Sequence, residues 1–76
     1  MTEPVGDDGM VGRVGRVTVP IPSSGPGEVV LSIRGGRESF AAWSDEPITK
    51  HETVVVVGVR SARSVTVTPF PEARDL

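Results

Sequence analysis

The sequence contains no cysteine, which excludes disulfide bonds and thiolate metal sites. It has a single histidine, His51, which cannot form a zinc site alone. No run approaches the roughly 20 apolar residues of a membrane span, and the N-terminal stretch lacks the basic-then-apolar pattern of a signal peptide. From these absences we expect a soluble chain without a metal or another cofactor.

Helical periodicity is also missing, because no segment of useful length repeats apolar residues every three to four positions. The most apolar segment, residues 53–59, reads Thr-Val-Val-Val-Val-Gly-Val. Valine loses side-chain freedom in a helix and packs well on a pleated sheet. We therefore expect this segment to form a central strand with both faces covered.

Residues 28–34 and 37–44 alternate apolar and polar residues, the pattern of half-buried strands. This alternation sends Trp43 outward. The residues expected to point inward are Val29, Leu31, Ile33, Phe40 and Ala42.

Gly35-Gly36 lies between these two segments and predicts a two-residue hairpin turn, since glycine takes positive φ at little cost. Folding on this turn would place Phe40 opposite Leu31. It would also place Arg34 opposite Arg37, a like-charge pair. The two segments are therefore expected to form a hairpin in this register.

Residues 11–19 predict the first strand, although their pattern is interrupted. Strict alternation puts Val17 and Val19 on one face and Val14 on the other. We place the slip near Gly15, because glycine inside a strand often marks a bulge or a sharp bend.

The rest of the chain predicts loops and one more strand. Residues 20–27 are rich in proline, glycine and serine and predict a loop. Ile48 is expected to plug the core, residues 64–68 to form the last strand with Val65 and Val67 inward, and Phe70 to cover an open end. Together these elements predict an all-β fold, a small five-stranded β-barrel.

Charge divides the chain into three parts. The two ends hold the whole acidic excess: Glu3, Asp7, Asp8, Glu72 and Asp75 against Arg74. The body holds seven basic and five acidic side chains. We expect residues 1–10 and 71–76 to be acidic, disordered tails around a barrel domain of residues 11–70.

The order of short motifs along the body carries a further signal. The motifs are Gly-Arg-Val-Gly-Arg-Val at 12–17, Gly-Glu-Val-Val-Leu at 27–31, Gly-Gly-Arg at 35–37, Ser-Asp-Glu-Pro-Ile at 44–48, Val-Val-Val-Val at 54–57 and Arg-Ser-Val-Thr-Val-Thr-Pro at 63–69. In this order they resemble the soluble domain of NfeD-like proteins, in its actinobacterial version. The resemblance implies an OB-fold barrel that lacks the usual helix between its third and fourth strands.

The resemblance also implies a function. NfeD-like proteins are typically membrane-anchored, act beside SPFH-type scaffolds (stomatin or flotillin relatives) and regulate membrane protease activity. By resemblance we expect such a partner, and a location in the cytoplasm or at the cytoplasmic face of the membrane.

Two features depart from the family pattern. His51 occupies a turn position that is usually glycine, and the membrane helices that normally precede the barrel are not in this sequence. The chain is then either part of a longer protein or a stand-alone member whose membrane contact is indirect.

Catalysis finds little support in the sequence. Ser23, Ser24, Asp45 and His51 are the residue types of a hydrolase triad, but no nucleophile elbow surrounds either serine. We interpret them as loop and surface residues. We therefore expect no catalytic residue and no enzyme activity.

Trp43, with Arg34 and Arg37, is the candidate interaction surface, since tryptophan is enriched among interface hot spots. One alternative is that Trp43 folds over Pro47 or the bend of the first strand as part of a satellite core. Another is that the ring and the two arginines bind single-stranded nucleic acid, as some OB domains do. The small positive excess of the body argues against nucleic acid, so a protein contact is preferred.

The other arginines of the body, Arg13, Arg16, Arg60 and Arg63, are interpreted as a solvated face. A basic patch toward anionic lipid headgroups is the alternative. Residues 12–15 also match the GXXG clamp of a KH domain, but that clamp requires flanking helices, which this sequence does not predict.

Overall fold

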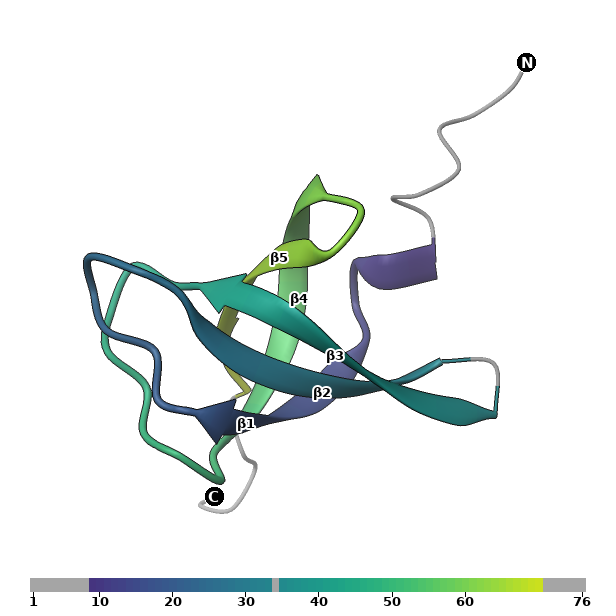
Figure 1. Cartoon of the computed structure of the whole chain (residues 1–76), viewed down its shortest axis with the longest axis horizontal. Helices are drawn as coiled ribbons and strands as arrows, with labels where there is room; N and C mark the ends of the chain where they lie inside the picture. The colour runs from purple at the N-terminus through teal and green to yellow at the C-terminus, as the bar shows by residue number, and fades with distance from the viewer. Residues whose placement is uncertain (1–8, 34, 71–76) are drawn as a thin grey trace.

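The computed structural model describes residues 9–33 and 35–70. Their strands are β1 (Val14–Val19), β2 (Gly27–Ile33), β3 (Gly36–Trp43), β4 (Thr53–Ser61) and β5 (Ser64–Pro69). They close into one barrel in the order β1-β2-β3-β5-β4 (Figure 1). Residues 44–52 connect β3 to β4 without a helix. The predicted all-β, five-stranded barrel is confirmed, including the missing helix.

Strand β1 joins two hairpins, because it pairs antiparallel with both β2 and β4. One hairpin is β2–β3 and the other is β4–β5, both antiparallel. The barrel closes where β3 lies parallel to β5, over the short register from Ala41–Ser64 to Trp43–Thr66. In Figure 1 the β2–β3 hairpin extends past the barrel as an arm.

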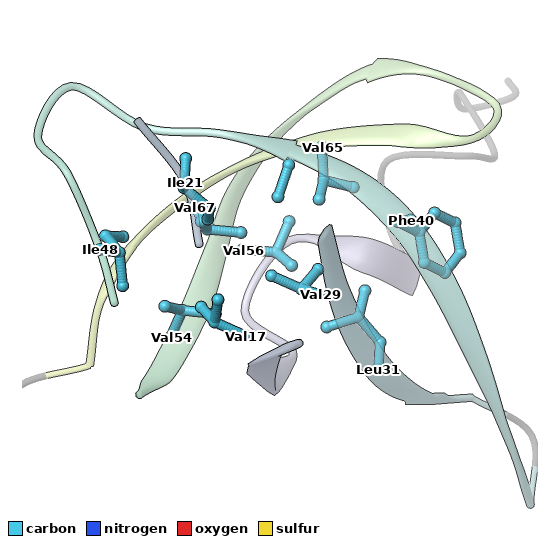
Figure 2. Close-up of a cluster of buried hydrophobic side chains, with 11 residues drawn as sticks. Val17, Ile21, Val29, Leu31, Phe40, Ile48, Val54, Val56, Val65 and Val67 are labelled. Carbon is cyan, nitrogen blue, oxygen red and sulfur yellow. The ribbon is translucent and has the colours of Figure 1, made fainter. Parts of the chain in front are cut away.

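One hydrophobic cluster fills the barrel (Figure 2). Burying a side chain of this size contributes about 1.5–3 kcal/mol. No polar or charged side chain is buried among the described residues. The cluster consists of Val17, Ile21, Val29, Leu31, Phe40, Ala42, Ile48, Val54, Val56, Val65 and Val67.

The β2–β3 hairpin turns one residue earlier than the sequence predicted. Ile33 pairs with Gly36, so Gly36 belongs to β3 and the turn that includes Gly35 lies before it. Gly35 carries the positive φ of 81°. The Gly35-Gly36 turn is therefore wrong by one position, since the first glycine alone takes the left-handed backbone.

This turn changes the cross-strand partners. Phe40 lies opposite Val29 and not its predicted partner, and Arg37 lies opposite Ser32. The predicted pairing of Arg37 with Arg34 is wrong, and Arg34 itself lies outside the described residues. The register differs from the predicted one by two residues. A shift of two leaves each side chain on its predicted face, so alternation could not detect it.

The irregularity of β1 lies at Thr18 and not near Gly15. The register with β2 shifts between Val17 and Val19, so Thr18 is an extra residue, a β-bulge. Val17 is fully buried, whereas Val19 is 48% exposed. The prediction that these two valines share a face is wrong, because the bulge reverses the alternation between them.

Two isoleucines from the connecting segments close one end of the barrel (Figure 2). Ile48 is buried as predicted, and it forms an isolated bridge with Ile21. Ile21 was expected only within a loop. Phe70 does not cover an open end, because it is 41% exposed, whereas Ile21 and Ile48 are buried.

Phe40 lies at the opposite end of the buried cluster (Figure 2). The guanidinium of Arg63 is over its ring, with Cζ 5.5 Å from the ring centroid. Arg63 also donates from Nη2 to the carbonyl oxygen of Ser39 at 3.4 Å. An arginine from the β4–β5 turn therefore covers this end of the core.

His51 adopts a left-handed backbone, with φ of 78°. Its N–H donates to the carbonyl oxygen of Val17 at 2.8 Å, which ties the turn before β4 to β1. Histidine tolerates positive φ better than most residues. The chain therefore retains a conformation that suits glycine at this position.

The folded body includes residues just before β1. Met10 packs against the core, and the N–H of Gly12 donates to the carbonyl oxygen of Val56 at 2.8 Å. Apart from Gly9 and Met10, the predicted tails, residues 1–10 and 71–76, lie outside the described residues. No helix in the described part of the chain has the length and hydropathy needed to cross a bilayer.

Candidate interaction surfaces

The outward side chains of β1, β4, β5 and the end of β3 form one continuous wall of the barrel. The register places Val14 beside Val55 and Val55 beside Thr68. A second row joins Gly58, Thr66 and Trp43. We call this surface the outer wall, and define it as Val14, Trp43, Val55, Val57, Gly58, Arg60, Thr66 and Thr68.

Valines of the outer wall are open to solvent. Val14 is 45% exposed and Val57 is 51% exposed, beside the partly buried Val55. The prediction that residues 53–59 have both faces covered is wrong. Covering the second face of a strand requires another layer of elements, and the described residues supply none. The outer wall therefore presents apolar surface without an acidic side chain.

Trp43 faces outward, as alternation predicted, and is half-buried. The guanidinium of Arg60 lies over its ring, with Cζ 4.3 Å from the ring centroid. Such a cation–π contact at a surface contributes about 0.5–1 kcal/mol. The contact holds the indole in one orientation at the edge of the outer wall.

The predicted grouping of Trp43 with Arg37 is wrong. The two residues lie near opposite ends of β3, separated by about 20 Å at the usual rise per strand residue. The third member of that group, Arg34, lies outside the described residues. Arg60, which had been assigned to a solvated face, is the cation that contacts the tryptophan ring.

A second surface is a shallow groove over β1 and β2. Its volume is about 420 Å³, and its lining residues are Val14, Gly15, Arg16, Val30, Ser32, Arg37 and Thr53. We call it the β1–β2 groove. The guanidinium of Arg13 lies beside it, because its Nη1 donates to the carbonyl oxygen of Ser32 at 3.0 Å. The charged residues at this groove are all basic.

The residue types of a hydrolase triad do not converge. Ser23 and Ser24 lie exposed in the β1–β2 loop, whereas Asp45 and His51 are exposed on the connection from β3 to β4. No hydrogen bond links these side chains within the described ranges. Those ranges also contain no group of three metal-ligating side chains.

Sequence reasoning missed the outer wall and the β1–β2 groove. A signal for the wall was present in residues 54–57: where the sequence predicts no helix to cover a sheet, alternate valines of a strand must face solvent. No comparable signal marked the groove, because Arg16 and Arg37 come from strands that are not sequential neighbours. Their proximity depends on the register of β2 with both neighbours.

Comparison with known proteins identifies similar domains. The family model described as the NfeD C-terminal domain matches residues 14–68. The solution structure of the soluble domain of the NfeD protein YuaF from Bacillus subtilis is similar, with a TM-score of 0.70 and 36% sequence identity. This match covers 80% of this chain and 74% of that one.

A second similar structure is the C-terminal domain of stomatin operon partner protein 1510-C from Pyrococcus horikoshii. Its TM-score is 0.69 and its sequence identity is 25%, over 91% of this chain and all of that one (100%). Among curated protein sequences, none matches. The two similar structures are thus the soluble domain of an NfeD protein and the C-terminal domain of a stomatin operon partner protein.

Proposed function

The chain belongs to the NfeD C-terminal domain family, and from this premise we propose that it is a non-enzymatic interaction module. Its partner is a membrane scaffold protein of the SPFH type, a stomatin or flotillin relative. The similar archaeal domain comes from a protein named as a stomatin operon partner, which supports this choice.

The outer wall is the observation that carries the proposal. Exposed valines and a tryptophan held by an arginine occupy it, and it contains no acidic side chain. The centres of protein interfaces are likewise poor in acidic residues and enriched in aromatic residues and arginine. The module therefore docks by its outer wall, with Trp43 as an anchor.

The scaffold holds the module at the cytoplasmic face of the membrane. There the bound module contributes to the regulation of membrane proteases. This role requires binding and no bond-making chemistry, which agrees with the dispersed positions of Ser24, Asp45 and His51.

The test is a pull-down from detergent-solubilised membranes of the source organism. The baits are the wild-type chain, Val57→Asp, Trp43→Ala and the control Val19→Asp. Val19 is 48% exposed and Val57 is 51% exposed, and both lie at register shifts, but Val19 is outside the outer wall. Circular dichroism of each bait verifies that it is folded.

Wild type and Val19→Asp are expected to recover an SPFH-type protein. Trp43→Ala and Val57→Asp are expected to reduce its recovery at least about tenfold, since truncating an interface hot spot costs about 2 kcal/mol or more and a buried unpaired carboxylate is also costly. Equal loss with Val19→Asp would contradict the outer wall as the docking surface. Failure of the wild type to recover any SPFH-type protein would contradict the partner.

Single-stranded nucleic acid was the alternative suggested by the sequence. Such binding combines aromatic stacking with a basic groove. Here Trp43 and Arg37 lie far apart on β3, and none of the residues lining the β1–β2 groove is aromatic. We therefore favour the protein partner. Salt-dependent oligonucleotide binding that changes Trp43 fluorescence would reverse this preference.

A further inference from the structure

The β1–β2 groove gathers positive charge without an acidic counterpart. Arg16 from β1 and Arg37 from β3 line the same hollow, and both are exposed. Within residues 9–33 and 35–70, the ion pair found joins Arg63 to Glu38, so neither groove arginine is paired with a carboxylate there. Guanidinium groups bind carboxylates through short, charge-assisted hydrogen bonds. The groove is therefore suited to an anionic ligand.

The side chains that line the groove favour an extended peptide segment as that ligand. Val14 and Val30 provide apolar surface, and Ser32 and Thr53 provide hydroxyl groups. The lining contains no aromatic side chain on which a base could stack. Carboxylates on a flexible chain can reach both arginines and leave the apolar surface to the chain between them.

The chain contains a segment of this chemistry immediately before the described residues. Residues 1–8 include Glu3, Asp7 and Asp8 and no basic side chain. They connect to Gly9, whose carbonyl oxygen accepts a hydrogen bond from Nε of Arg13. The same guanidinium donates from Nη1 to the carbonyl oxygen of Ser32, which lines the groove. One arginine side chain thus bridges the start of the described chain and the groove.

We propose that the acidic N-terminal segment, residues 1–8, occupies the β1–β2 groove and pairs its carboxylates with Arg16 and Arg37. Eight extended residues span up to about 26 Å, so Glu3 can lie across the groove while Asp7 and Asp8 stay near its entrance. Covalent attachment gives the segment an effective concentration on the order of millimolar. Ion pairs between exposed charges contribute about 0.2–1 kcal/mol each, so the segment exchanges between the groove and solvent.

The consequence is that any partner using this groove must displace the N-terminal segment. An acidic peptide would compete with it directly, whereas a partner on the outer wall would not, apart from the shared Val14. The inference is independent of the SPFH-type partner, since it concerns a contact within one chain.

Amide chemical shifts in the intact chain test the proposal. The variant Glu3→Gln/Asp7→Asn/Asp8→Asn removes the carboxylates, and Glu72→Gln/Asp75→Asn is the matched control at the other end. We expect the N-terminal variant to shift the amide signals of Val14, Ser32 and Thr53, and the control to leave them in place. Raising the salt concentration to about 1 M, where the Debye length falls to about 3 Å, should shift the wild-type signals in the same direction.

A second variant, Arg16→Gln/Arg37→Gln, removes the two cations with which the carboxylates are proposed to pair. In this background the N-terminal neutralisation should no longer move the groove amides. Groove amides that stay in place in the first variant, or that move equally in the control, would overturn the proposal. Shifts that grow with protein concentration would also overturn it, because the occupant would then be the segment of a second copy.

Discussion

Ile21 and Ile48 exchange two backbone hydrogen bonds of 2.9 Å, although neither belongs to a strand of the barrel. The N–H of each residue donates to the carbonyl oxygen of the other, and both side chains are buried. The loop after β1 and the connection before β4 are joined by this bridge. The end of the barrel is therefore closed by a paired unit, and each isoleucine holds the other in place.

Replacing either isoleucine by alanine is expected to lower the free energy of unfolding by about 2–4 kcal/mol, through lost burial and a cavity. The double variant should lose less than the sum, because residues in contact couple. Urea denaturation measures all three. Val19→Ala, at an exposed position near Ile21, should change stability by about 0.5 kcal/mol or less. Strict additivity of the two core variants would contradict a cooperative bridge.

His51→Gly is expected to raise the free energy of unfolding by about 0.5–1 kcal/mol. The residue has φ of 78°, where glycine has no steric cost and a side chain is strained. Its exposed imidazole contributes no buried contact in exchange. Lys50→Gly in the same turn is the control and should be destabilising, since Lys50 does not have positive φ. Thermal unfolding measures the stability of both variants. A melting temperature of His51→Gly below that of the wild type would refute the prediction.

Gly27→Ala is expected to destabilise the barrel by about 1–3 kcal/mol, because the added methyl group overpacks the start of β2. A Cβ there would lie 2.4 Å from the carbonyl oxygen of Pro20 and 2.5 Å from that of Val19. Backbone atoms cannot move aside as a flexible side chain can. Gly58→Ala is the matched control, since its Cβ would meet Thr66 Cβ at 3.8 Å, an ordinary contact. Denaturation midpoints should fall for Gly27→Ala and not for Gly58→Ala.

Arg60→Gln is expected to move the fluorescence emission of Trp43, the single tryptophan, to longer wavelength. The guanidinium that covers the indole ring at 4.3 Å is removed, so water reaches that face of the ring. Arg63→Gln serves as the control, because Arg63 lies over Phe40 instead. An identical emission shift from both variants would mean that the Arg60 contact is not specific.

Alternation along the sequence was sufficient to predict most of the core. Val29, Leu31, Phe40, Val65 and Val67 all point inward, and all are buried. The five strands and the missing helix followed from the same patterns. Period-two alternation identifies faces reliably, because a wrong face would expose a whole apolar set to water.

Alternation could not predict how the strands are positioned relative to one another. The β2–β3 register differed by two residues from the expected one, a change that leaves faces intact. The bulge at Thr18 reversed the face of Val19, with no special residue to mark it. Ile21 is flanked by prolines, which signalled a loop and concealed a core residue. The grouping of Trp43 with Arg37 failed for another reason, because six positions along one strand separate the two residues by about 20 Å in any register.

Closure of the barrel by the short parallel seam between β3 and β5 has a consequence for its dynamics. The seam and the β1–β4 junction have three register pairs each, but the seam adds one backbone bond, from Ala41 to Arg63, whereas the junction adds four, donated by Gly12, Val17, His51 and Val56. Parallel pairs are also slightly weaker than antiparallel ones. The barrel should therefore open locally between β3 and β5 first. In this opening the β2–β3 and β4–β5 hairpins move apart while both remain paired with β1. Amide protons along that seam would exchange with solvent before those of the β1–β4 junction, and the core would first meet water beneath Trp43.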